Sequence, residues 1–229
     1  MRLTCVAALF ATATLAVPAQ AENLTGFRIE ARVGWESASA AADYPNPDDD
    51  EDEQGDELLT VSEDENGIAY GIEAGYDFSV GSWVTLGAYG GVEFSDIERC
   101  GEVAGDDLGC VGAGRNFTAG VRAGFAVSPT FLVYAKGGYS NGRVEFSYDS
   151  DVDEDDPLDA DFAEASEDRG GYHVGGGVEL AFAANLFGKV EYVYTDYGAA
   201  RFLAADEDLP GAAVRLSRHQ VTAGVGLRF

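Results

Sequence analysis

Hydrophobic and polar residues alternate along eight segments of the chain. In the first segment the odd positions from Phe27 to Trp35 are apolar, whereas the even positions from Arg28 to Gly34 are polar or glycine. Because successive side chains of a β-strand point to opposite faces, this period of two predicts a strand. The same alternation recurs at residues 70–78, 84–94, 117–125, 131–139, 172–182, 190–194 and 218–229. We therefore expect an all-β fold with eight strands of about ten residues.

The connections between the expected strands fall into two classes. Three are short turns, at residues 80–82, 128–130 and 183–185. The other four are long, at about 38–66, 95–114, 149–170 and 198–213. Strands of about ten residues can cross a bilayer at a tilt near 45°. Short turns at one end and long loops at the other predict an eight-stranded antiparallel up-and-down transmembrane β-barrel. The alternation slips near Asn141–Gly142, where we expect a β-bulge.

The first 21 residues are predicted to be a secretory signal peptide. Arg2 precedes an apolar run from Val6 to Val17, and Pro18 and Ala19-Gln20-Ala21 follow. This order matches a signal peptide that is cleaved before Glu22. A run of about 12 apolar residues is too short to span a bilayer core of roughly 30 Å as a helix. The barrel domain is expected to cover residues 22–229.

The charge of the chain limits its partners. It has 41 acidic against 14 basic residues, for a formal net charge of −27, and 46% of its residues are apolar. The apolar share is too high for a disordered acidic segment. Since nucleic acid phosphates would be repelled, we expect no nucleic acid partner.

The chemistry of the alternating faces separates a membrane barrel from a soluble one. A lipocalin-like barrel also has eight strands, but it keeps its apolar face inside, and it remains the alternative here. The polar face of this chain is rich in glycine and fits a narrow lumen better than a solvated exterior. Seven bases and six acids are expected inside: Arg28, Glu30, Arg32, Glu73, Asp77, Glu93, Arg122, Lys136, Glu179, Lys189, Glu191, Arg218 and Arg228. The expected interior charges nearly cancel. This balance is needed because each buried charge requires a partner of opposite sign.

Three short motifs carry a family resemblance. They are Gly75-Tyr76-Asp77-Phe78, the Glu191–Tyr194 strand with Asp196-Tyr197-Gly198, and the final Gly224–Phe229 segment. The chain resembles the eight-stranded outer membrane β-barrels related to the OmpA transmembrane domain and the Opa-type proteins, often labelled the porin family. The resemblance covers the mature chain and implies the cell outer membrane, with outer membrane lipid and lipopolysaccharide as surroundings. The terminal Phe229 resembles the signal read by the barrel assembly machinery. Because no further domain follows Phe229, we expect no OmpA-like anchoring to the cell wall.

Two of the three cysteines remain after signal cleavage. Cys5 leaves with the signal peptide, so Cys100 and Cys110 remain. In an oxidising compartment we expect them to form a local disulfide. No histidine lies near them in the sequence, and we predict neither a metal site nor a cofactor.

Two acidic runs fall in the expected long loops. Residues 48–57 contain eight acids in ten, and residues 149–168 contain eleven in twenty. Clustered carboxylates can attract divalent cations. The segment from Asp149 is not an EF-hand, because its sixth and twelfth positions are Glu154 and Ala160. Either a solvated, self-repelling loop or a loose cation atmosphere fits these runs.

Candidate catalytic residues are few. Ser140 lies in a Gly-x-Ser-x-Gly motif, but no helix is expected to follow it, as a nucleophile elbow would require. His219 shares the outward face of the last strand with Ser217, an arrangement that an enzyme acting on lipid A acyl chains could use. The other histidine, His173, is expected in the lumen.

These expectations combine into one hypothesis with two alternatives. We expect a monomeric, non-enzymatic outer membrane barrel with a structural or surface-interaction role, acidic loops outside and a charge-filled lumen. A small diffusion pore is the first alternative, since lumen glycines leave space. A lipid A modifying enzyme is the second.

Overall fold

The structure is a computed structural model that describes residues 24–45, 58–104, 107–149, 162–202 and 212–229. Within these ranges the chain forms nine β-strands: β1 (Gly26–Pro45), β2 (Leu58–Val80), β3 (Val84–Ser95), β4 (Glu98–Ala104), β5 (Asp107–Ser128), β6 (Phe131–Asp149), β7 (Phe162–Ala181), β8 (Leu186–Phe202) and β9 (Ala212–Arg228). Among the described residues, no helix is long and apolar enough to cross a membrane.

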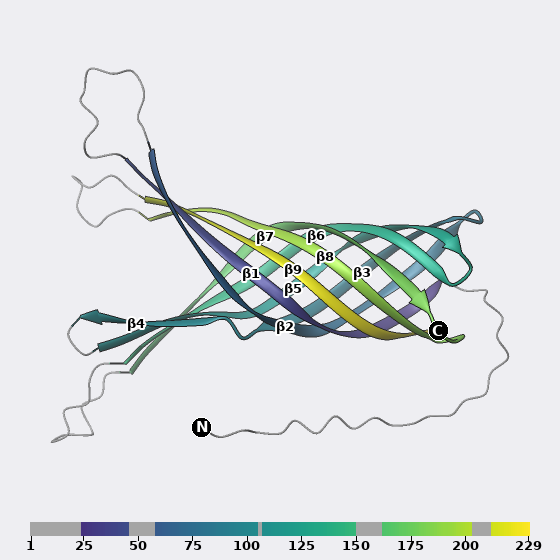
Figure 1. The fold of residues 1–229 in the computed structure, drawn as a ribbon, viewed down its shortest axis with the longest axis horizontal. Coiled ribbons are helices and arrows are strands. Elements are labelled where there is room, and N and C mark those ends of the chain that lie inside the picture. The colour runs from purple at the N-terminus through teal and green to yellow at the C-terminus, as the bar shows by residue number, and fades with distance from the viewer. Residues whose placement is uncertain (1–23, 46–57, 105–106, 150–161, 203–211) are drawn as a thin grey trace, which may run out of the picture.

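Eight of the nine described strands close into a barrel. All neighbouring strands are antiparallel, the first strand β1 pairs with the last strand β9, and β3 pairs with β5. The remaining strand, β4, pairs only with β5 in the described structure and extends beyond the ring as a hairpin. Figure 1 shows the tilted strands, with the short turns at one end and the β4 hairpin at the other. We call these the turn end and the loop end. The predicted eight-stranded antiparallel barrel is confirmed.

The strands run beyond the bounds predicted from the sequence. The eight ring strands have 12 to 23 residues rather than about ten. The β1–β2 ladder continues to Pro45↔Leu58, β4 lies inside the predicted loop 95–114, and strands also enter 149–170 and 198–213. The predicted strands were therefore too short, and the predicted loops 38–66, 95–114, 149–170 and 198–213 were too long. Backbone hydrogen bonds continue a ladder even where neither face is apolar, so the period of two fades before the strand ends.

The bulge lies on a different strand from the one expected. The β6–β7 register is continuous through Asn141 and Gly142. The irregularity is in β5, where the pairs Ala113↔Val144 and Asn116↔Gly142 leave one extra residue on the β5 side. The prediction of a bulge at Asn141–Gly142 was therefore wrong by one strand. Glycines at positions 112 and 114 make this part of β5 easy to bend.

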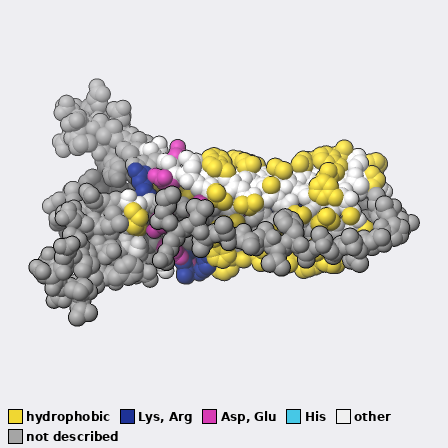
Figure 2. Space-filling view, turned by 60° about the horizontal axis from the view of Figure 1, so that its bottom comes forward, with side chains coloured by type: hydrophobic (Ala, Val, Ile, Leu, Met, Phe, Trp, Pro, Cys, Tyr) yellow, Lys and Arg dark blue, Asp and Glu magenta, His cyan; other side chains and the backbone are white. Residues whose placement is uncertain are grey.

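The outer wall of the barrel is apolar. Outward side chains such as Val33, Val121 and Phe125 are at least half exposed. In Figure 2 hydrophobic side chains cover much of the visible wall of the barrel, and the charged side chains in view gather toward its loop end. A lipocalin-like barrel would show the opposite arrangement. The apolar face therefore points outward, as in a barrel that is surrounded by lipid.

Several sequence predictions lie outside the described residues. These are the signal peptide at residues 1–21, the acidic run at 48–57, and most of the acidic run at 149–168. They remain predictions.

Candidate functional site

The barrel interior holds a buried network of charges. All thirteen charged residues expected in the lumen, Asp77 among them, are buried inside the barrel. Glu36 is buried there as well. In the described part of the chain, the buried charged groups are thus seven bases and seven acids, and their formal charges cancel. Buried ions need partners of this kind, because an unpaired charge in a low dielectric is costly.

At the turn end, two arginines and two acids form a closed ring. Asp77 lies 2.5 Å from Arg122 and 3.2 Å from Arg228. Glu179 lies 3.2 Å from the same Arg122 and 2.7 Å from the same Arg228. Each charge therefore contacts two of opposite sign, and Arg28, 3.3 Å from Asp77, links this ring to the middle of the barrel.

In the middle of the barrel, two glutamates are each surrounded by cations. Glu73 contacts Arg28, Arg32 and Lys136 at 2.8, 2.9 and 2.7 Å. Glu191 contacts Arg32, Lys136 and Lys189 at 3.3, 3.1 and 3.1 Å, and it accepts a hydrogen bond from Tyr134. Lys189 and Arg28 also pair with Glu30.

Near the loop end, the network finishes on a residue that the sequence analysis missed. Arg32 contacts Glu93 at 3.0 Å, and Glu93 also contacts Arg218 at 3.1 Å. Arg218 in turn lies 2.8 Å from Glu36, which also accepts hydrogen bonds from Gln220 and Ser95. The predicted strand stopped at Trp35, one residue too early. Extending its parity by a single position would have placed Glu36 inside.

Long side chains from other strands fill the space above the lumen glycines. A Cβ added at Gly75 would lie 3.0 Å from a guanidinium nitrogen of Arg28, and one at Gly177 would lie 2.8 Å from the Tyr134 hydroxyl. One at Gly120 would lie 2.7 Å from the Tyr89 hydroxyl. The space above these glycines is therefore occupied by the charge network and its aromatic partners.

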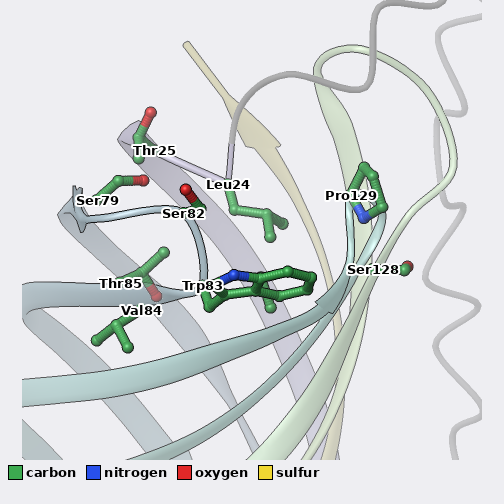
Figure 3. Close-up of a pocket in the computed structure, with 10 residues that line it drawn as sticks. Leu24, Thr25, Ser79, Ser82, Trp83, Val84, Thr85, Ser128 and Pro129 are labelled. Carbon is green, nitrogen blue, oxygen red and sulfur yellow. The ribbon is translucent and has the colours of Figure 1, made fainter.

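Apolar side chains close the turn end. Leu24, Ala126, Leu132 and Tyr134 form a buried cluster inside the base of the barrel, and Phe187 is 1% exposed. Outside this cluster lies a pocket of about 290 Å³ between the turns and the start of β1. Figure 3 shows Leu24 over the indole of Trp83, with the hydroxyls of Thr25, Ser79, Ser82 and Thr85 around it.

His173 lies in the lumen, as predicted, in a polar chain with two hydroxyl groups. Its Nδ1 is 2.8 Å from the Ser140 hydroxyl, and its Nε2 is hydrogen-bonded to the Tyr89 hydroxyl. All three side chains are buried. The neighbouring cavity, lined also by Thr118, has about 10 Å³, close to the smallest space that holds one water. Ser140 and His173 thus form a hydrogen-bonded pair that is buried in the lumen.

His219 faces outward and packs against two tyrosines. Its Nδ1 is 2.7 Å from the Tyr192 hydroxyl, and its ring centroid is 4.9 Å from that of Tyr194. Ser217, which has the same strand parity, borders the loop-end cavity. The imidazole of the pair considered for lipid A chemistry is therefore held by two tyrosines.

The loop end opens into a second cavity of about 340 Å³, which we call the bowl. Its floor is formed by Asn116, Tyr197 and Arg218, directly above the charge network. Arg115 and Arg143 also line it, and both guanidinium groups bond to Asp168. The outward apolar side chains of β7 begin at Tyr172, so Asp168 lies beyond the apolar belt. The hydrogen bond from Arg143, aided by Arg115, holds the pKa of Asp168 below its ordinary value. Ser217 and Arg218, which line the bowl, were named from the sequence, but no cavity was predicted here.

The structure places both the predicted disulfide and the C-terminal phenylalanine. Cys100 and Cys110 lie directly opposite each other in the β4–β5 hairpin and form the predicted disulfide. Phe229 is bound to β1 through two backbone hydrogen bonds with Phe27, and its side chain is exposed at the turn end. Its role as an assembly signal remains a prediction.

Known proteins resemble this chain in sequence and in fold. The 31 kDa outer-membrane immunogenic protein of Brucella melitensis is 24% identical over 245 residues, which cover 99% of this chain and 98% of that protein. The 22 kDa outer membrane protein of Rhizobium leguminosarum is 29% identical over 130 residues, which cover 55% of this chain and 54% of that protein. The crystal structure of Neisserial surface protein A covers 90% of this chain and 98% of its own, with 16% identity and a TM-score of 0.45.

The family assignment comes from a match over nearly the whole chain. The model of the outer membrane protein beta-barrel domain matches residues 6–229. The relatives are named outer membrane proteins, and the closed barrel has an apolar outer wall. The protein is therefore located in the outer membrane, and the chain belongs to the outer membrane protein beta-barrel domain family.

Proposed function

We propose that this outer membrane barrel is a non-conducting scaffold that presents its loop end for surface interactions. The observation that carries the proposal is the buried charge network, in which seven bases and seven acids of the described chain are buried inside the barrel. An ion that entered the lumen would have to break several of these contacts at once, which disfavours conduction.

Two further features support a lumen that does not conduct ions. The side chains of Phe187 and Leu132 are almost fully buried at the turn end. The cavity beside His173 is about 10 Å³, far smaller than a hydrated ion needs. The small diffusion pore is therefore the less favoured function.

An enzymatic role also has less support. Ser140 and His173 are enclosed in the lumen, and His219 is held by Tyr192 and Tyr194 on the outer wall. The hydrogen-bond partners given for the two histidines in the described residues are the buried Ser140 and Tyr89 hydroxyls and the Tyr192 phenol, so neither has an accessible serine or cysteine beside it. We therefore assign interaction, and not catalysis, to the loop end.

Planar-bilayer conductance of the refolded mature protein tests this proposal. A heat-shifted gel band first verifies that the barrel has formed. We expect no channels above the bare-bilayer level in 1 M salt. Reproducible ion-selective steps would overturn the proposal and make the lumen charges the functional site.

A further inference from the structure

The barrel divides into two sheets at its loop end. The last pair of the β7–β8 ladder toward the loop end is Tyr172↔Asp196, and the last pair of the β2–β3 ladder is Ala69↔Ser95. Beyond these pairs, β8, β9, β1 and β2 continue as one sheet, and β4, β5, β6 and β7 continue as another. Figure 1 shows the two groups of strand ends lying apart. The described ring therefore has one gap between β2 and β4 and a second gap between β7 and β8.

The two gaps differ in how they are bridged. Arg99 on β4 lies 2.6 Å from Glu65 on β2, so an ion pair crosses the first gap. In the described part of β7 and β8, the last hydrogen bond between their side chains toward the loop end joins the Tyr172 hydroxyl to Asp196, at 3.1 Å. Beyond it, residues 162–171 of β7 have β6 as their strand partner in the described structure. This stretch is a free sheet edge, which we call the β7 edge.

A local bend in β8 opens the second gap. Gly198 has a φ of +72°, in the left-handed region that favours glycine, and its N–H donates to the Asp196 carboxylate at 2.6 Å. The β8–β9 register shifts between Asp196 and Ala199, which leaves one extra residue on β8. A bulge of this kind bends the strand that carries it. The separation of β8 from β7 therefore has a structural cause in the sequence.

The hydrogen bonds at the turn end show which backbone groups of β7 face β8. In an antiparallel strand, the N–H and C=O of one residue point to the same neighbour, and successive residues alternate between the two neighbours. The Ala181 N–H donates to the carbonyl of Thr130, directly before β6. The next N–H, that of Phe182, donates to the carbonyl of Leu186 at the start of β8. Even-numbered residues therefore face β8.

This alternation places a row of backbone groups at the gap. The β6–β7 register is unbroken from Phe162 to Ala181, so the same parity holds along the whole strand. At Ser166, Asp168 and Gly170 the strand β8 has already turned away, and all three residues are exposed. Unpaired backbone groups at a sheet edge are a template for an extended peptide, which adds as a further strand.

The charge around the β7 edge selects the kind of peptide. On the edge itself the charges are paired, since Asp168 bonds to Arg115 and Arg143, and Glu167 lies 3.0 Å from Arg169. The sequence segments joined to the two strands are acidic. Residues 150–161, which precede β7, contain seven acids and no base, and residues 203–211, which follow β8, contain three acids and no base. Such segments attract a basic peptide and repel an acidic one.

We infer that the β7 edge binds an extended, basic peptide segment of another protein as an added β-strand. The peptide backbone would pair with Ser166, Asp168 and Gly170, and its lysine or arginine side chains would be attracted by the acidic segments. A second copy of this chain fits less well, because each copy has a net charge of −27. The inference rests on the proposed function, in which the loop end carries the interaction, and it names the class of partner.

Amide hydrogen exchange measured by NMR can test the pairing on the full mature protein in phosphatidylcholine nanodiscs, whose lipid has no net charge. The probe is an acetylated and amidated octapeptide of alternating lysine and valine, and the control peptide has glutamate in place of lysine. With the lysine peptide, we expect at least tenfold slower exchange at Ser166, Asp168 and Gly170. Exchange at Glu167 and Arg169 should not change, because their N–H groups face β6.

Three outcomes of the exchange measurement would overturn the inference. One is the absence of protection with the lysine peptide, and another is equal protection with the glutamate peptide. The third is protection that rises with protein concentration when no peptide is present, which would assign the β7 edge to a second copy of the chain.

A proline substitution locates the site. Ser166→Pro removes an N–H that faces the gap and leaves the β6–β7 hydrogen bonds in place, a position at which sheet edges tolerate proline. It should weaken binding of the fluorescently labelled lysine peptide at least fivefold, measured by anisotropy. Ser166→Ala is the matched control, because it keeps the N–H, and it should bind as the wild type does. Equal binding by the two variants would overturn the inference.

A modified peptide tests the same point without a variant, should Ser166→Pro lack the heat-shifted gel band. The lysine peptide with every backbone nitrogen methylated keeps its charge but has no N–H to donate between its residues. It should bind at least fivefold more weakly than the unmodified peptide. Equal binding of the two peptides would show that charge alone holds them, and would overturn the added strand.

Conductance separates this inference from the proposed function. Channels together with peptide binding that Ser166→Pro weakens would overturn the scaffold role alone. A bilayer without channels, together with no binding of the lysine peptide, would overturn the assignment of the β7 edge alone.

Discussion

Glu36 on β1 and Arg218 on β9 form an ion pair at the boundary between the charge-filled lumen and the bowl. Arg218 Nε lies 2.8 Å from Glu36 Oε2, and both side chains are buried. Arg218 also lines the floor of the bowl. This one pair therefore ends the network, closes the barrel between its first and last strands, and forms part of the floor of the bowl.

Glu36→Gln is expected to destabilise the barrel. The substitution keeps the shape of the side chain but leaves Arg218 with Glu93, which Arg32 already shares. Breaking a buried pair costs on the order of 3 kcal/mol. The measurement is the urea midpoint of unfolding in detergent. Glu98→Gln serves as the control because Glu98 is exposed on β4, and an equal midpoint for both variants would contradict this account.

Arg28→Ala should make the lumen leak cations. Arg28 contacts Glu30, Glu73 and Asp77 and covers Gly75, so its loss removes both a plug and a positive charge. With Arg28 replaced, the described buried groups would have a formal charge of −1, which favours cations over anions.

Planar-bilayer recording in a salt gradient measures this effect of Arg28→Ala. Ile29→Ala is the control, since Ile29 is the next residue and faces outward. We expect brief cation-selective openings only in Arg28→Ala. Silence in both variants would mean that the remaining side chains seal the lumen without Arg28.

The sequence predicted the wall and lumen well because each ring strand separates two different environments. Val33 faces outward and Arg32 faces inward, and lipid and lumen require opposite chemistry at these positions. The alternation of apolar and polar residues ended where the inward and outward faces of the strand became chemically similar. Beyond Glu36 the inward residues are Ala38 and Ala40, so neither the longer β1 nor its role in the bowl could be recognised from the period of two.

The bowl itself could not be predicted from a single sequence. Its residues come from many different strands, and only the register of the ladders brings Ala40, Val144 and Leu216 to one cavity. The bulge near Arg115 changes which residues face inward. The alternation suggested a slip in this region, but it did not identify the strand that carries the extra residue.

Loss of the disulfide should loosen the β4–β5 hairpin and leave the barrel intact. Cys100 and Cys110 are ten residues apart in sequence, and β4 has no other strand partner in the described structure. Closing so short a loop contributes roughly 2 to 3 kcal/mol in the entropic model, and the effect is local.

Limited trypsin digestion of the Cys100→Ser/Cys110→Ser variant measures this loosening, since Arg99 is an exposed cleavage site in the hairpin. We expect cleavage there to become at least several times faster, with an unchanged heat-shifted band. Wild-type protein treated with a reductant should behave in the same way. Equal cleavage rates with and without the disulfide would show that other contacts order the hairpin.

Two glycine substitutions should have opposite outcomes because their surroundings differ. Gly120 faces the lumen, where an added Cβ would overlap the Gly137 carbonyl oxygen and lie 2.7 Å from the Tyr89 hydroxyl. Gly90 is exposed, and the nearest atom to an added Cβ, the Thr118 carbonyl oxygen, is 3.6 Å away.

Overpacking such as that at Gly120 costs about 1 to 3 kcal/mol, so Gly120→Ala should lower the urea midpoint of unfolding, or prevent the heat-shifted band. Gly90→Ala should be neutral or slightly stabilising. If both variants unfold at the wild-type midpoint, the lumen is less tightly packed around Tyr89 than these distances require.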